Sequence, residues 1–224
     1  MRAGNARYRT VEDFPATMPV FPLAGALLLP GSHLPLNIFE PRYLAMIDHV
    51  LAVGRTICMV QPQRGDMASD ESHPPLSQVG CIGRVTSFSE TGDGRYLISL
   101  AGICRGRLVK EVPQGDALFR SFRIAPLLAD LSVTEEERDV DRDQLMKVFR
   151  AYLDTNRLEA DWDSIEKAGN LALVNSLCMM SPFGPPEKQA LLEAENLKDR
   201  SATLIAMLQM LLARATGGGT STLQ

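Results

Sequence analysis

Histidine and cysteine are the side chains of this sequence best suited to nucleophilic or metal chemistry, and their spacing limits that chemistry. Zinc ligands usually occur in close pairs along a chain, such as C-x-x-C. The candidates here are isolated from one another: His33, His49, His73, Cys58, Cys81, Cys104 and Cys178. We therefore expect no metal and no cofactor, and we expect the cysteines to be small buried side chains.

The sequence motifs of common enzyme classes are absent as well. There is no phosphate-binding G-x-x-x-x-G-K-[ST] loop, and neither H-E-x-x-H nor G-x-S-x-G occurs. A nucleophile assisted by histidine would require a contact between residues that are distant in the sequence, and nothing in their spacing indicates one. We therefore expect no catalytic residue.

Glu40 and Arg42 form a charged pair inside the most distinctive apolar segment, residues 34–43. Such a pair can clamp a ligand. It can also be structural, because a carboxylate near the start of a helix is stabilised by the helix dipole. We favour the structural interpretation.

Arginines recur along the expected strands and raise the question of phosphate binding. A face that carried them together could bind RNA, whereas alternate strand positions usually point into solvent. We favour the solvated face, because the whole chain has a net charge of −4 and lacks an aromatic-rich strand for base stacking. The set comprises Arg84, Arg95, Arg105, Arg107, Arg120 and Arg123.

Residues 17–126 predict a β-rich domain, a small barrel or sandwich, because short apolar runs alternate with prolines and glycines. Asp93 and Gly94 predict a hairpin with a type I′ turn between residues 85–90 and 96–100. One helix interrupts the strands, with Pro41 in its first turn and Gly54 at its end. The expected strands are residues 26–29, 56–60, 79–89, 95–101, 106–112 and 118–124.

Residues 127–214 predict a helical bundle, because apolar residues recur there at helical spacing. A capping box at residues 134–137 begins the first helix. Ser164 can cap a second helix that runs to Cys178, Pro185 and Pro186 begin a third, and the last carries the leucines from residue 197 to 212. We expect a loose leader at 1–16, an exposed loop at 64–75 and a flexible tail at 215–224.

Charge and hydropathy complete the interpretation. Residues 1–126 carry 13 basic and 11 acidic side chains, a net of +2, and residues 127–224 carry 10 and 16, a net of −6. The longest apolar stretch, residues 20–30, is interrupted by Pro22 and Gly25 and is too short to span a bilayer. We therefore expect a cytoplasmic protein with no membrane partner, and nucleic acid is an unlikely partner.

Several motifs together resemble the N-terminal substrate-binding domain of the Lon protease family. The longest is residues 34–43, which contains Leu34, Phe39, Glu40, Pro41, Arg42 and Tyr43. It is preceded by Val-Phe-Pro-Leu around Pro22 and Leu-Pro-Gly around Pro30. The resemblance continues at residues 79–85, 93–96, 100–105 and 186–193, and it covers about residues 17–214.

The resemblance implies an α+β chain, a PUA-like β-barrel followed by an α-helical bundle, of a bacterial stand-alone type. Lon proteases also contain an ATPase domain and a Ser–Lys peptidase domain, and no segment here corresponds to either. The implied function is non-catalytic binding of unfolded or tagged polypeptides, as an adaptor or chaperone-like factor with a protease or chaperone as partner. Leu34 and Phe39 are the candidate peptide contacts, although burial in the barrel is at least as probable for both. RNA binding and small-ligand sensing stay as alternatives, and the sequence does not set the oligomeric state.

Overall fold

The computed structural model describes residues 1–63, 74–113, 115–132 and 139–217. The contacts divide the chain into two compact units. The barrel unit comprises Met1–Val133 and Phe183–Leu192, and the helical unit comprises Thr134–Pro182 and Glu193–Gln224. The predicted capping box at 134–137, most of the predicted loop at 64–75 and the end of the predicted tail lie outside the described residues.

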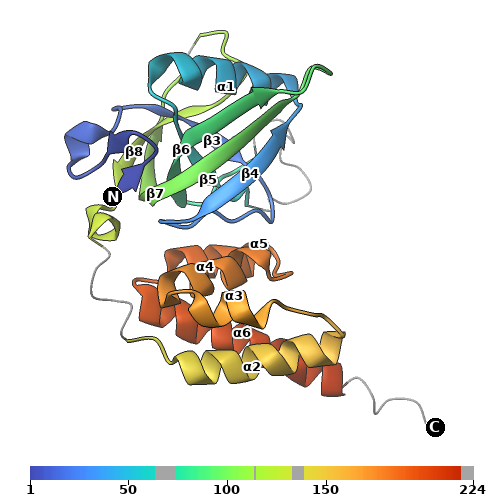
Figure 1. The fold of residues 1–224 in the computed structure, drawn as a ribbon. Helices are drawn as coiled ribbons and strands as arrows, with labels where there is room; N and C mark the ends of the chain where they lie inside the picture. The colour runs from blue at the N-terminus through green and yellow to red at the C-terminus, as the bar shows by residue number, and fades with distance from the viewer. Residues whose placement is uncertain (64–73, 114, 133–138, 218–224) are drawn as a thin grey trace. The chain divides into compact units, whose positions relative to one another are not determined.

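Six strands build the main sheet of the first unit, and five of them close into a barrel (Figure 1). The strand order is β4-β7-β6-β5-β3-β8, and a further pairing of β7 with β8 closes the ring. Among the pairings of these described strands, β3 and β5 alone run parallel to each other. The α+β class is confirmed. The strands are β3 (Met18–Pro22), β4 (His33–Ile38), β5 (Thr56–Val60), β6 (Val79–Glu90), β7 (Tyr96–Glu111) and β8 (Ser121–Pro126).

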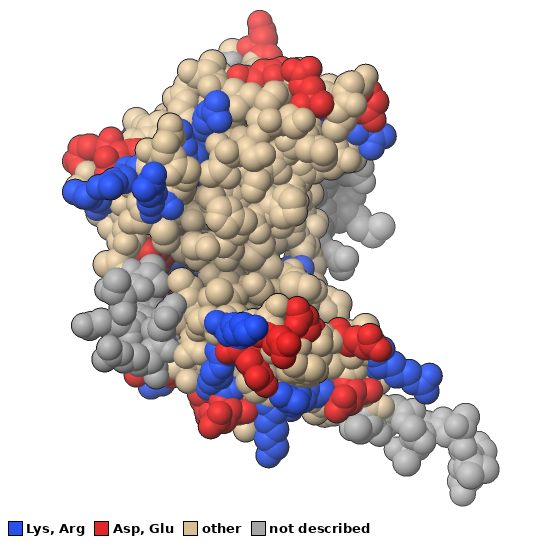
Figure 2. Space-filling view, in the orientation of Figure 1, with Lys and Arg blue, Asp and Glu red and all other residues tan. Residues whose placement is uncertain are grey.

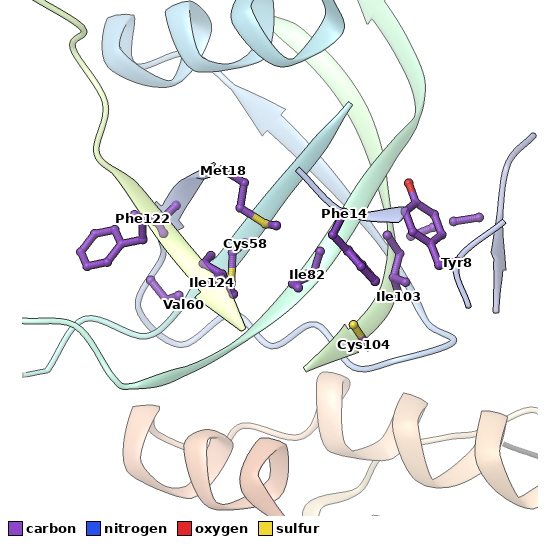
Figure 3. Packing of buried hydrophobic residues seen from close by; sticks show 13 residues of the cluster. Tyr8, Phe14, Met18, Cys58, Val60, Ile82, Ile103, Cys104, Phe122 and Ile124 are labelled. Carbon is purple, nitrogen blue, oxygen red and sulfur yellow. The ribbon is translucent and has the colours of Figure 1, made fainter. Parts of the chain in front are cut away.

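The barrel interior is filled by apolar side chains that range from cysteine and valine to phenylalanine (Figure 3). Cys58 lies opposite Ile82 in the register of β5 and β6, and Ile82 lies opposite Cys104 in that of β6 and β7. All three side chains are fully buried. All four cysteines of the chain are buried thiols, which confirms their predicted role as small apolar groups.

The predicted hairpin is confirmed, but its turn is not type I′. Strands β6 and β7 pair as far as Glu90 and Tyr96, so residues 91–95 form the loop. Positive φ angles occur at Gly92 and Gly94, whereas Asp93 keeps a negative one. A type I′ turn requires positive φ at both central residues, so the longer loop replaces it. The predicted strands 95–101 and 106–112 are parts of one long strand, β7.

Residues 26–29 do not form the predicted strand, although Leu27, Leu28 and Leu29 are buried. Their backbone lies directly against β7 at Gly102, where a Cβ atom would come 2.2 Å from the carbonyl oxygen of Leu29. Only glycine permits this approach. The apolar run thus packs as an irregular segment onto the barrel.

Residues 1–16 differ from the predicted loose leader. They form a hairpin of β1 (Arg2–Ala3) and β2 (Ala6–Arg7) and a 3-10 turn, η1 (Val11–Asp13). Tyr8 and Phe14 are buried in the barrel core, with ring centroids 5.0 Å apart. Two aromatic side chains that pack into the core hold the otherwise polar segment in place.

Helix α1 (Pro41–Val53) confirms the predicted helix, with Pro41 at its first position and Gly54 as its C-cap. After the last barrel strand the chain contains η2 (Leu128–Leu131), α2 (Arg142–Asn156), α3 (Trp162–Lys167), α4 (Asn170–Met180), α5 (Pro185–Glu193) and α6 (Leu197–Gly217). The predicted single helix from Ser164 to Cys178 is two helices, because Ala168 and Gly169 are extended. Among the described residues, no helix combines the length and apolar character needed to cross a membrane.

Helix α5 belongs to the barrel unit, although the sequence pattern predicts it as part of the helical bundle. Lys188 donates from Nζ to the carbonyl oxygen of Gly25 at 2.7 Å, and Gln189 donates from Nε2 to that of Val79 at 3.0 Å. The predicted ranges 17–126 and 127–214 therefore differ from the compact units at this helix, because contacts distant in sequence decide its place.

Candidate functional site

The segment 34–43 supplies one edge of the sheet and the start of α1. Strand β4 pairs with β7 in register from His33 opposite Ala101 to Ile38 opposite Tyr96. Tyr43, in the first turn of α1, donates from its hydroxyl to the carbonyl oxygen of Pro22 at 3.1 Å. Its ring lies 4.4 Å from that of Phe21. The most distinctive motif of the sequence thus holds α1 and β4 on the barrel.

Glu40 and Arg42 form the predicted pair. Arg42 donates from Nε and Nη2 to Oε2 of Glu40 at 3.1 and 2.8 Å, and its guanidinium lies 4.6 Å from the centre of the Tyr43 ring. Both side chains are about two-fifths exposed. Glu40 is the N-cap residue of α1, yet its side chain makes no capping hydrogen bond. The carboxylate is therefore engaged with the arginine rather than with the helix backbone.

A cavity of about 390 Å³ lies beside this pair, lined in part by Pro22, Arg42, Tyr43, Phe119 and Arg120. Arg120 is also paired, with Glu111, through two hydrogen bonds of 2.8 Å. Burial raises the pKa of the Tyr43 hydroxyl, so it stays protonated near neutral pH. Because both guanidinium groups already face a carboxylate, the cavity offers little attraction to an anion.

The two predicted peptide contacts are not brought together. Leu34 is half-buried and lies on the same face of β4 as Leu36 and Ile38, the more buried face of the strand. Phe39 is 61% exposed, and the guanidinium of Arg95 lies 5.8 Å from the centre of its ring. Strand residues two apart share a face and residues one apart do not, so positions 34 and 39 fall on different faces.

The exposed face of this strand pair holds residues that sequence reasoning missed. Pro35 and Asn37 are exposed on β4, and Leu97, which lies opposite Asn37 on β7, is 47% exposed. The available signal was in the sequence of residues 33–38, where Leu34, Leu36 and Ile38 alternate with His, Pro and Asn. Neither β4 nor the paired half of β7, Tyr96 to Ala101, contains a Lys, Arg, Asp or Glu. Figure 2 shows this as a broad surface without charged side chains over the barrel strands.

The six arginines of the predicted phosphate face lie in different surroundings. Arg105 is buried and pairs with Asp130 at 2.7 Å. Arg84 donates to the carbonyl oxygen of Gly54 at 2.6 Å, and Arg95 pairs with Asp93 at 3.3 Å. With Arg120 on Glu111, four of the six have protein partners, which leaves exposed Arg107 and Arg123 on β7 and β8.

The cysteines are poorly placed for nucleophilic chemistry. Burial raises the pKa of the Cys58 thiol strongly and that of Cys104 and Cys178 to about 12. Thiols with such pKa values carry almost no thiolate at neutral pH. Within the described part of the chain, no three His, Cys, Asp or Glu side chains are placed to hold a metal ion.

Comparisons with known proteins agree with this architecture. Residues 17–210 match the model of the ATP-dependent protease La (LON) substrate-binding domain. The chain is 26% identical over 204 residues to the Lon protease of Desulfosudis oleivorans and 28% identical over 204 residues to Lon protease 1 of Bdellovibrio bacteriovorus. These matches cover 85% and 88% of the chain but only 23% and 25% of the relatives, so the chain spans about a quarter of their length.

Two solved structures share the fold. A Lon N-terminal domain protein from Xanthomonas campestris superposes with a TM-score of 0.57, over 85% of this chain and 97% of that one. The N-terminal domain of a Mycobacterium avium complex Lon protease gives 0.64, over 86% and 98%. Sequence identity is 17% in both cases, so these likenesses concern the fold alone. The family model matches most of this chain, and Lon N-terminal domains of known structure share its fold. The chain therefore belongs to the Lon substrate-binding domain family.

Proposed function

We propose that this chain is a non-catalytic binding module that captures extended segments of unfolded or tagged polypeptide at strand β4. It would serve as an adaptor or chaperone-like factor for a protease or chaperone. The observation that carries the proposal is an edge strand on a charge-free surface that ends at an exposed phenylalanine. Strand β4 pairs with β7 on one side, and its own residues and those opposite are uncharged.

The backbone of β4 is suited to weak and reversible strand addition. A proline within a strand sits where its missing N–H would face away from the neighbour. Pro35 therefore marks the outward positions of β4, so that His33 and Asn37 offer outward hydrogen-bonding groups and Pro35 offers only its carbonyl. An incoming segment can pair there, while the missing donor discourages long edge-to-edge association. We expect micromolar or weaker binding, because an extended segment must be ordered on capture.

The side chains of this surface favour apolar segments over nucleic acid. Phe39 and Leu97 are large and exposed, and Arg95 lies over the Phe39 ring. Four of the six arginines of the predicted phosphate face already have carboxylate or carbonyl partners. RNA binding would need several lysine or arginine side chains that are not paired within the protein, and it would weaken steeply with salt.

The test is a titration of a fluorescently labelled, permanently unfolded protein against the full chain at low and high salt. Phe39→Ala and Leu97→Ala should weaken binding several-fold, and salt should change it little. Val109→Ala is the matched control, because Val109 is an exposed apolar residue in the other half of the same strand β7. Failure to bind at either salt would overturn the proposal, and binding only at low salt would redirect it to RNA. ATP hydrolysis or casein cleavage by the purified chain would contradict the non-catalytic role.

A further inference from the structure

A second apolar recess lies within the helical unit. It has a volume of about 720 Å³ and is formed by α2, α3, α4 and the segments that join them. Its floor consists of buried side chains, among them Phe149, Leu153, Leu173 and Leu177. A recess of this size and apolar lining falls in the range of sites that enclose a ligand group.

Local structure explains why the recess is open. Small side chains at Ala168, Ala172 and Ser176 leave space between the helices. Arg142 ties the start of α2 to the end of α3, because its guanidinium donates to the carbonyl oxygens of Ile165 and Ala168 at 2.8 and 3.0 Å. The break at Gly169 between α3 and α4 allows α3 to stand off from the floor.

The rim exposes apolar side chains that a self-contained bundle would bury. Met180 is 82% exposed and Leu158 is 51% exposed, and both line the recess. Exposed methionine is typical of surfaces that adapt to varied apolar partners, because its side chain is flexible and polarisable. The rim thus extends the apolar floor outward.

The charge of the recess has one sign. Glu159 and Asp161 line it, and none of its lining residues, all within the described part of the chain, is a lysine, arginine or histidine. Hydrogen bonds from the Ser164 side chain and backbone lower the pKa of Asp161, so this carboxylate is ionised at neutral pH. An occupant with positive charge beside its apolar part fits this arrangement.

We propose that this recess, defined here as the helical groove, holds a large apolar side chain of a polypeptide segment whose next residues are lysine or arginine. The inference rests on the proposed polypeptide-binding function and adds a second, charge-selective contact to it. The apolar floor takes the anchor, Met180 and Leu158 cover it, and Glu159 and Asp161 face the cationic neighbours.

The test uses short synthetic peptides and the intact chain. The probe carries phenylalanine and leucine followed by lysines; one control peptide replaces the lysines with glutamates, and another replaces the apolar pair with serines. Binding is followed by fluorescence of Trp162, whose ring lies 6.2 Å from that of Phe149 on the groove floor. The chain contains a single tryptophan, so the signal is local. The lysine peptide should bind, and both control peptides should bind at least several-fold more weakly.

Variants at exposed rim positions locate the contact without disturbing the fold. Met180→Ser removes the apolar side chain without adding charge and should weaken the lysine peptide about tenfold, which corresponds to about 1.4 kcal/mol. Glu159→Lys should weaken it and strengthen the glutamate peptide. Met210→Ser is the matched control, because Met210 is an exposed methionine on α6 outside the groove, and it should change nothing.

The outcomes separate this inference from the proposed function. If Met180→Ser and Glu159→Lys bind the lysine peptide as the unmodified chain does, the helical groove is not the site, even if unfolded protein still binds at β4. If the groove variants lose the peptide while Phe39→Ala has no effect on unfolded protein, the groove stands and the β4 proposal fails. Equal binding of the lysine and glutamate peptides would overturn the charge preference.

Discussion

The barrel and the helical unit differ in how far they bury their apolar side chains. In the barrel, Cys58, Ile82 and Cys104 lie across three hydrogen-bonded strands and are fully shielded from solvent. In the helical unit, Leu158 and Met180 remain exposed at the rim of an apolar recess. A strand needs neighbours for its backbone hydrogen bonds, so a sheet tends to close. A helix satisfies its own backbone, so helices can stand apart at little polar cost. Closure therefore supplies rigidity in one unit, and incomplete closure supplies an accessible surface in the other.

The largest expected effect is on the barrel side of this comparison. Arg105 and Asp130 are both 9% exposed, and Asp130 accepts from the Arg105 backbone as well as from its guanidinium. Asp130→Ala should lower the free energy of unfolding of the barrel by about 3–5 kcal/mol, because it leaves a buried guanidinium without its carboxylate. Mass-resolved alkylation of Cys58, Cys81 and Cys104 in urea measures this. Unchanged protection of those thiols would mean that the ion pair is not what secures the barrel.

In the helical unit, interior and groove residues should differ sharply. Leu145 on α2 is fully buried, and Leu145→Ala should lower the stability of the unit by about 3 kcal/mol through lost burial and a cavity. Met180→Ala, at an exposed position, should change it by less than about 0.5 kcal/mol. Trp162 fluorescence in urea reports both. A large loss of stability in Met180→Ala would show that the rim is a packed part of the core.

Helix α5 provides a pH-dependent test of why one helix belongs to the barrel unit. Desolvation lowers the pKa of Lys188 from its ordinary value of 10.5, and its ammonium donates to Gly25. The unfolded chain therefore binds more protons at this group than the folded chain between the two pKa values. The stability of the unmodified chain should rise with pH over that range, up to about 10.5, relative to Lys188→Met. Contributions from the cysteines cancel, because both proteins contain them.

Urea titrations of both proteins at several alkaline pH values provide the measurement. Below the folded pKa the difference in stability between the two proteins should be constant. A difference that stays constant across the whole alkaline range would contradict a desolvated Lys188.

The smallest effect is expected at the conspicuous charged pair of the sequence. Glu40 and Arg42 are both about two-fifths exposed, and exposed ion pairs contribute between zero and about 1 kcal/mol. Glu40→Ala should lower barrel stability by less than about 1 kcal/mol, and Glu40→Gln should behave in the same way. Thermal unfolding followed by circular dichroism checks this. A loss comparable to that of Asp130→Ala would place Glu40 among the main supports of the barrel.

Sequence patterns predicted local elements well where the signal was local. The helix from Pro41, the strand at residues 56–60 and the β6–β7 hairpin all follow from turn residues and periodicity. The buried cysteines also followed from their positions in apolar strands. The family assignment rested on the motif around residues 34–43, which is continuous in sequence.

Contacts between distant residues escaped the sequence patterns. Tyr8 and Phe14 lie in a polar segment, so nothing local indicated that they are buried in the barrel core. The place of α5 depends on Lys188 reaching Gly25, more than 150 residues away. Among the candidate contacts, Leu34 is half-buried because the register of β4 on β7 fixes its face, whereas Phe39 follows the last residue of β4 and is exposed.

The sequence by itself determined the class of fold, the order of the main elements and the absence of recognisable catalytic motifs, because these depend on composition and on patterns a few residues long. Tertiary structure decided which surfaces are accessible. The charge-free face of β4 and the helical groove both join residues from separate elements, and their exposure depends on how tightly those elements pack. Packing of this kind follows from the sum of many weak contacts, which no short stretch of sequence encodes.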